Sequence, residues 1–210
     1  MNDFTVQQLS SHYLFQAAGD VIELNAWVPD DIIDQVKLLN ANPANYSKKV
    51  QRSPEDKGGP HTGYQYNHAP KSWGLPSNAR TVGSIFYDAG NYIFPHRDKW
   101  KQIKSNGDIE GDSFRLINYV NRTNTSEFCF ILDNKIIKFE PKRWYAINTQ
   151  KVHQGMCFVD GAIHLSAALH FDRNCREETT SWLLDSIPFA RYHDDKKGVD
   201  CDRINSNDWY

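Results

Sequence analysis

From Thr81 to Phe171 the chain consists of short apolar or alternating segments with turn residues between them. Segments of roughly four to eight residues bounded in this way are typical of β-strands. We expect strands at residues 81–87, 92–98, 114–120, 128–132, 136–139, 144–148 and 163–171, the fourth and fifth joined by a hairpin through Asp133-Asn134. This pattern predicts a mainly β fold, a double-sheet jelly roll or double-stranded β-helix with a few flanking helices, which holds ligands in the mouth of its barrel.

The segments that flank this region give weaker signals. Tyr13 to Leu24 alternates loosely and predicts a strand pair or a bent strand. The stretch from Pro29 to Leu39 predicts an amphipathic helix, because its apolar residues recur at helical spacing and Pro with two acids begins its first turn. A second helix is expected from Glu177 to Ser186, leaving the barrel, and the polar residues 191–210 predict no element.

Residues 42–80 are rich in Pro, Gly, Asn, Ser and Lys and show no sustained period, so we expect a long loop or flap. Tyr64 and Tyr66 would lie on one face of this segment if it is extended. We take these two residues, with Trp100, as candidate substrate-binding residues. The alternative is that the rings only pin the loop to the barrel.

Composition limits the classes of function. The 210 residues, 40% of them apolar, suit one domain spanning 1–210, with a core at about 81–172 and a C-terminal helix and tail at 173–210. A net charge of −2 offers no basic field for nucleic acid. No apolar run is long enough to span a bilayer and no signal peptide is apparent, so we expect no membrane partner and a cytoplasmic location. The four cysteines form no Cys-x-x-Cys motif and are expected to be reduced.

A candidate metal site is the strongest chemical signal in the sequence. His96 and Asp98 are two residues apart, so on an extended strand both side chains leave the same face, and His153 can complete a set of three ligands. Two imidazoles and one carboxylate with open positions opposite them form the facial triad of non-haem Fe(II) oxygenases. The alternative is a surface charge pair. We therefore predict that His96, Asp98 and His153 are both metal ligands and catalytic residues.

Five segments within residues 81–172 together resemble the aspartyl/asparaginyl and prolyl hydroxylase branch of the Fe(II)/2-oxoglutarate oxygenases. In order, they are Ile-Phe-Tyr-Asp-Ala-Gly-Asn-Tyr-Ile-Phe-Pro-His-Arg-Asp, Phe-Arg-Leu-Ile-Asn-Tyr-Val-Asn, Phe-Ile-Leu-Asp-Asn-Lys-Ile-Ile-Lys-Phe-Glu-Pro-Lys-Arg-Trp-Tyr-Ala-Ile-Asn, Val-His-Gln-Gly and Ala-Ile-His-Leu. The resemblance implies that His96, Asp98 and His153 hold Fe(II) and that Arg115 binds a carboxylate of 2-oxoglutarate. It further implies that dioxygen is consumed and that an unactivated C–H bond is hydroxylated, in a small molecule or in an amino acid, free or within a peptide.

The sequence departs from this family at two positions. Ala162 stands where the family usually has an Arg that pairs with the far carboxylate of 2-oxoglutarate, and Ile117 stands where a His is frequent. Because a buried carboxylate without a cation is costly, Arg115 is the best substitute, with His164 and Ser166 adding hydrogen bonds. Arg115 can instead pair with Asp112 or Asp98, and His164 can be a hydrogen-bonded core histidine.

Two other functions remain open from the sequence. A cupin-like metalloenzyme that does not use 2-oxoglutarate is supported by the missing arginine at Ala162. A non-catalytic jelly-roll module would instead bind a sugar or peptide through its aromatic loops. The sequence favours a small-molecule or amino-acid substrate and carries no indication of the oligomeric state.

Overall fold

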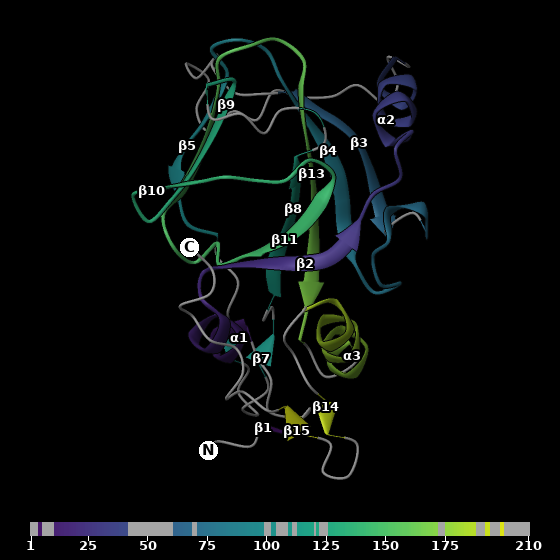
Figure 1. Ribbon diagram of the computed structural model, residues 1–210, viewed down its shortest axis with the longest axis vertical. Helices are drawn as coiled ribbons and strands as arrows, with labels where there is room; N and C mark the ends of the chain where they lie inside the picture. The colour runs from purple at the N-terminus through teal and green to yellow at the C-terminus, as the bar shows by residue number, and fades with distance from the viewer. Residues whose placement is uncertain are drawn as a thin grey trace.

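The computed structural model describes most of the strand-rich region and the parts of the chain that pack on it. The described residues are 4–5, 11–41, 61–68, 71–98, 102–103, 109–110, 113–119, 121, 126–171, 175–187, 192–193 and 198–199. Their architecture is mainly β, with two large antiparallel sheets, two small ones and a few helices (Figure 1). The jelly roll predicted from the strand pattern is therefore confirmed.

The larger sheet has six strands in the order β2-β11-β8-β13-β4-β3. These are β2 (Val21–Trp27), β11 (Arg143–Ile147), β8 (Ser113–Tyr119), β13 (Ala162–His170), β4 (Arg80–Tyr87) and β3 (His61–His68). Apart from β3 and β4, neighbours in this order are not consecutive in sequence, as in a jelly roll, where successive strands pass between the two sheets. The long strand β13 lies in the middle and pairs with both β8 and β4.

The smaller sheet has four strands in the order β10-β9-β12-β5. These are β10 (Lys135–Ile137), β9 (Phe128–Leu132), β12 (His153–Cys157) and β5 (Tyr92–His96). The predicted hairpin between β9 and β10 is confirmed, since Asp133 and Asn134 both have positive φ angles, +48° and +67°. Positive φ at both turn residues gives the turn whose twist matches that of the flanking strands. β5 is an edge strand, and it carries the first candidate ligand at its end.

Two hydrophobic clusters cover the opposite faces of the six-stranded sheet. Trp144 of β11 belongs to one cluster and the adjacent Tyr145 belongs to the other. They lie on different sides of the sheet because successive side chains of a strand point to opposite faces. The inner cluster, between the two sheets, contains Tyr87, Ile117, Phe128, Phe130, Leu132, Phe139, Tyr145, Ile147, Cys157 and Ala162. The candidate site lies on this inner side, so the strands that build the core also present the site.

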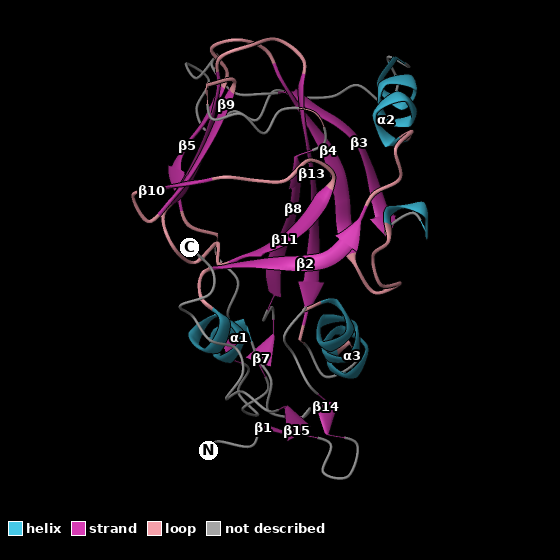
Figure 2. Ribbon diagram, viewed as in Figure 1, coloured by secondary structure: helices cyan, strands magenta, loops and turns pink. Residues whose placement is uncertain are grey.

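The outer cluster joins the six-stranded sheet to the helices, which Figure 2 shows beside and below that sheet. Ile32 and Val36 of α2 (Ile32–Ala41) are buried in it, as predicted for an amphipathic helix. Leu183 of α3 (Arg176–Ser186) is also buried there, and α3 contacts β2 and β13. The second helix is thus confirmed, but it packs back against the sheet instead of leaving the barrel.

The prediction of strand structure from Tyr13 to Leu24 is wrong for the first part of that range and confirmed from Val21 onward. Residues 11–18 form α1 (Ser11–Ala18), and only the residues from Val21 onward are extended, as β2. Leu14, Phe15 and Ala18 are buried together, a spacing that suits a helix better than a strand. Gly19 has a φ of +85° and donates its N–H to the Phe15 carbonyl at 3.0 Å. A glycine in this conformation ends a helix at no steric cost.

The prediction of a long loop over residues 42–80 is wrong for part of that range. Residues 61–68 form β3, an edge strand that pairs with β4, and a 3₁₀ turn follows at Lys71–Trp73. Its residues His-Thr-Gly-Tyr-Gln-Tyr-Asn-His show no apolar alternation, so the sequence pattern gave no strand signal, whereas the structure pairs it with β4, from His61 opposite Phe86 to His68 opposite Arg80. Residues 42–60 lie outside the described residues.

The remaining strands are short. β1 (Phe4–Thr5), β15 (Gly198–Val199) and β14 (Tyr192–His193) pair as a small sheet, and β6 (Gln102–Ile103) pairs with β7 (Ile109–Glu110). The tail thus contributes two strands that its polar sequence did not predict. Among the described residues no helix combines the length and the apolar character needed to cross a membrane.

Candidate metal centre

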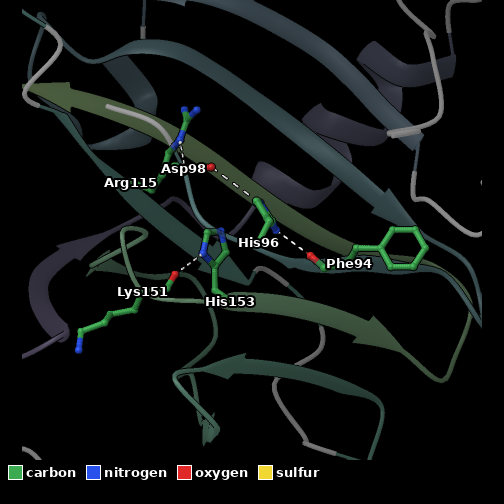
Figure 3. A network of polar contacts seen from close by, with 6 residues as sticks. All are labelled: Phe94, His96, Asp98, Arg115, Lys151 and His153. Atoms are coloured by element: carbon green, nitrogen blue, oxygen red, sulfur yellow. Dashed lines mark hydrogen bonds and ion pairs between the residues drawn. The ribbon is translucent and has the colours of Figure 1, made fainter. Parts of the chain in front are cut away.

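The three predicted ligands converge. His96, Asp98 and His153 each offer one ligand atom such that the three atoms lie within 4.8 Å of one another. The two imidazole rings are 4.1 Å apart between centroids, and Asp98 Oδ1 lies 3.7 Å from His96 Nε2 (Figure 3). His153 is 7% exposed, whereas His96 and Asp98 are half-buried. The grouping therefore faces the interior from one side and remains accessible from the other.

His96 reaches this position through an irregularity in β5. Ile93 pairs with Gly155, but His96 pairs with His153. Between these two pairs β5 advances by three residues while β12 advances by two, so β5 contains one extra residue. This is the geometry of a β-bulge, which re-aims the side chains that follow it. Without the extra residue, His96 would share the outer face with Phe94, which is 38% exposed. The bulge turns His96 to the inner face, where His153 lies.

Asp98 is not on a strand, because β5 ends at His96. The prediction that an extended strand aligns the two ligands is therefore wrong in its reason, although the two residues do meet. The backbone N–H of Asp98 donates to the Thr149 carbonyl at 2.9 Å. Thr149 follows β11, so this bond ties the ligand-bearing loop to the six-stranded sheet.

Both histidines are held by backbone carbonyls two residues before them. His96 Nδ1 lies 2.7 Å from the Phe94 carbonyl oxygen, and His153 Nδ1 lies 3.0 Å from the Lys151 carbonyl oxygen (Figure 3). A carbonyl oxygen only accepts, so each Nδ1 must carry the proton and donate it. The Nε2 atom of each ring is then the one left to bind an ion, which is the arrangement found in metal-binding histidines.

The protonation of His153 favours the same role. Burial lowers the pKa of His153, an effect opposed by its hydrogen bond to the Lys151 carbonyl and reinforced by the nearby His96. A lowered pKa keeps the ring neutral at neutral pH, and only the neutral ring can donate a lone pair to a metal ion. The donor set therefore fits a divalent transition metal.

Arg115 contacts the ligand set directly. Its Nε lies 3.3 Å from Asp98 Oδ2, with the Arg115 side chain 36% exposed and that of Asp98 27% exposed. This is the pairing with Asp98 that the sequence left as an alternative to a cosubstrate role. The contact uses one nitrogen of a group with five N–H donors, so the two roles are compatible. Asp112, the other expected partner, lies outside the described residues.

His164 and Ser166 lie on β13, on the face turned toward the smaller sheet. His164 Nδ1 is 3.5 Å from the Tyr87 hydroxyl, and the two rings are stacked. Burial lowers the pKa of His164 to about 3, with further lowering by Arg115 and His153, so the ring is neutral. The contact expected of a core histidine is present, and a role for either residue toward a cosubstrate stays a prediction.

Several groups at the centre carried no usable sequence signal. Tyr87 packs against His164, and its position opposite Ala162 follows only from the pairing of β4 with β13. The carbonyls of Phe94, Lys151 and Thr149 act through the backbone, which the residue type does not reveal.

The remaining candidates are only partly placed by the structure. Ala162, the departure from the family pattern, is buried on the inner side with 1% exposure. Tyr64 and Tyr66 lie on β3, and their side chains are outside the description. Trp100 lies outside the described residues altogether. The substrate-binding role of these aromatic residues stays a prediction.

Comparison with known proteins adds little at the level of sequence. No family model and no curated protein sequence matches the chain. Similar solved structures include a predicted oxalate decarboxylase from Thermotoga maritima, with a TM-score of 0.39 and 10% identity over 60% of this chain and 95% of that chain. An RmlC-like cupin from Shewanella frigidimarina NCIMB 400 has a TM-score of 0.35 and 14% identity over 59% of this chain and 92% of that chain. A cupin 2 domain-containing protein from Halorhodospira halophila has a TM-score of 0.35 and 11% identity over 58% of this chain and 72% of that chain. With TM-scores this low, these likenesses say nothing about activity, and the fold assignment stands on the chain's own strand order.

Proposed function

We propose that this chain is a non-haem Fe(II)/2-oxoglutarate-dependent dioxygenase that hydroxylates an unactivated C–H bond in a small molecule or an amino acid. The observation that carries the proposal is the shared orientation of the two histidines. Each Nδ1 is held by a carbonyl, which leaves the Nε2 atom of each ring to bind an ion, and one ligand atom from each of the two histidines and Asp98 lies within 4.8 Å of the others. Two imidazoles and one carboxylate with open positions beyond them are the ligands that such iron sites use.

The residues present fit a ferrous ion. His96 and His153 would each provide an imidazole nitrogen, and Asp98 would provide a carboxylate oxygen whose negative charge offsets part of the charge of a divalent ion. When bound, Fe(II) supplies the redox chemistry that couples the oxidative decarboxylation of 2-oxoglutarate by dioxygen to hydroxylation of the substrate. The chain's own contribution is to hold the three ligands on one side and to orient the organic reactants on the other.

Arg115 is the residue we assign to the carboxylate of 2-oxoglutarate. Its Nε is engaged with Asp98, and its half-exposed side chain retains four terminal N–H donors in a planar fork that matches a carboxylate. His164 and Ser166 would contribute hydrogen bonds from β13. Since His164 is neutral, it offers a hydrogen bond and no charge, so Arg115 must provide the positive charge that Ala162 cannot.

The proposal is tested by metal binding and turnover in purified protein. Anaerobic titration with Fe(II) should give one ion per chain for the wild type, and this binding should be lost in His96→Ala and His153→Ala. Addition of 2-oxoglutarate and air should then produce succinate, faster when a substrate is present. His170→Asn on β13 is the matched control, because it removes a histidine away from the cluster and should leave iron binding intact.

A metalloenzyme of the same fold that does not use 2-oxoglutarate is the second candidate. Two observations favour it. Arg115, the cation assigned to the cosubstrate, already uses its Nε in an ion pair with Asp98. Ala162, which stands where the family usually has an arginine, is buried and offers no charge. This candidate predicts iron binding without 2-oxoglutarate binding and without succinate. Absence of bound metal in the wild type would contradict both enzymes and would favour a non-catalytic binding module.

A further inference from the structure

In each of the three candidate ligands, a second polar atom of the side chain, Nδ1 of each histidine and Oδ2 of Asp98, contacts another group of the protein. For His96 and His153 that group is a backbone carbonyl of the same strand region, two residues earlier in the chain. For Asp98 it is Arg115, on β8 of the opposite sheet. The histidines are thus oriented locally, whereas the carboxylate is oriented across the two sheets.

Asp98 is also the ligand most in need of such a restraint. It lies beyond the end of β5, where the ladder of the four-stranded sheet no longer constrains the chain, and its side chain is 27% exposed. Its backbone is held through Thr149, but that bond leaves the carboxylate free to rotate. In the structure Oδ1 faces His96 Nε2 at 3.7 Å, and Oδ2 faces Arg115 Nε at 3.3 Å (Figure 3).

We propose that Arg115 is a positioning residue for Asp98: by holding Oδ2 across the gap between the two sheets, it presents Oδ1 alone to the metal ion. This inference rests on the proposed metal site, and it is independent of whether 2-oxoglutarate is the cosubstrate. One oxygen then binds the ion while the other is bound to the guanidinium, so the carboxylate occupies a single coordination position. The positions opposite the triad stay available for the reactants.

The inference is tested with Co(II) in place of Fe(II) and without any cosubstrate, so that a role of Arg115 in carboxylate binding cannot affect the result. In Arg115→Met the dissociation constant for Co(II) should rise about 10- to 100-fold, the range typical when a group that orients a metal ligand is lost. The Co(II) d–d absorption spectrum should also change, because Asp98 is no longer held to one oxygen. Arg115→Lys keeps the charge and should recover most of the affinity.

A double-mutant cycle separates an effect through Asp98 from a direct effect of the charge. If Arg115 acts through Asp98, adding Arg115→Met to Asp98→Asn should change the Co(II) affinity less than about twofold beyond Asp98→Asn alone. Arg143→Met is the matched control: Arg143 lies on neighbouring β11 and pairs with Glu23 and Glu140, so its loss should not affect Co(II) binding.

The outcomes distinguish loss of the metal site from loss of the positioning role of Arg115. A wild type that binds no Co(II) removes the proposed metal site itself. A wild type that binds Co(II), with the same affinity and spectrum in Arg115→Met, leaves the metal site standing and overturns the positioning role. If Arg115→Met does not fold, Arg115→Gln replaces it both in the single comparison and in the cycle with Asp98→Asn.

Discussion

At the scale of single residues, burial has the same effect on the pKa of two histidines that have different neighbours. Burial lowers the pKa of both His153 and His164, so both rings are neutral at neutral pH. His153 is grouped with His96 and Asp98 as a candidate ligand, whereas His164 contacts Tyr87. A neutral ring can bind a metal ion or make a hydrogen bond without bringing a second positive charge close to Arg115.

His164 should make the folded protein sensitive to acid. Its pKa is about 3 when folded and near 6.5 when unfolded, so between these values the unfolded chain binds a proton that the folded chain does not. The free energy of unfolding therefore falls as the pH decreases through this window. The loss of stability caused by His164 is complete below about pH 3.

The measurement is the urea midpoint of the metal-free protein at several pH values between 7 and 4. Wild type should lose stability faster than His164→Gln as the pH falls, because the variant lacks the titrating group while His153 and all other groups are common to both. Curves that stay parallel over this range would exclude His164 as a source of acid sensitivity.

At the scale of elements, the contact of the 3₁₀ turn with β2 depends on one glycine. Gly74 follows that turn, has a φ of +69°, and a Cβ at this position would lie 2.9 Å from the Trp27 carbonyl oxygen. The neighbouring Trp73 is buried, and its carbonyl accepts a hydrogen bond from Trp144 Nε1 at 2.9 Å. The glycine thus allows a close approach that fixes a tryptophan pair on the outer face of the sheet.

Gly74→Ala should reduce the free energy of unfolding by roughly 1–3 kcal/mol, because both the backbone strain and the contact with a rigid carbonyl act against the methyl group. Gly90→Ala is the matched control: Gly90 also has a positive φ, +83°, but a Cβ there meets nothing within 4 Å. The control should therefore show the strain alone and a smaller loss. Chemical denaturation measures both, and equal losses would contradict the close contact at Gly74.

At the scale of the whole molecule, the candidate site joins the two sheets. His96 and His153 belong to the four-stranded sheet, while Asp98 is tied to the six-stranded sheet through Thr149 and Arg115. An ion bound by all three residues would connect these parts in the folded state only. Binding should therefore stabilise the fold as a whole.

Adding Mn(II) or Co(II) should raise the melting temperature of the wild type, and a chelator should reverse the effect. At a free metal concentration about 100 times the dissociation constant, the gain is about 2.7 kcal/mol. His96→Ala should show no such rise, whereas the His170→Asn control should behave as the wild type. An equal rise in His96→Ala would show that the stabilising ion binds elsewhere.

Much of the fold follows from local sequence patterns. The alternation and turn residues between 81 and 171 predicted β4, β5, β8, β9, β10, β11 and β13, because strand period and turn chemistry are local properties. They did not predict the short strands β6 and β7, nor β12, the strand that begins with His153. The error at α1 arose from a short segment in which helical and strand spacing are hard to separate. The strand β3 was missed because its partner, β4, and not its own residue types, makes it a strand.

The sequence by itself determined which residues meet at the candidate metal centre, since residue type decides which side chains can donate to an ion. Only the tertiary structure decided how they meet. The bulge in β5 turns His96 inward, backbone carbonyls select the Nε2 atoms, and Arg115 reaches Asp98 from the opposite sheet. Ladder register and contact between sheets depend on residues far apart in the chain, and the direction of a carbonyl depends on the backbone path and not on the residue type, so no sequence pattern contains them.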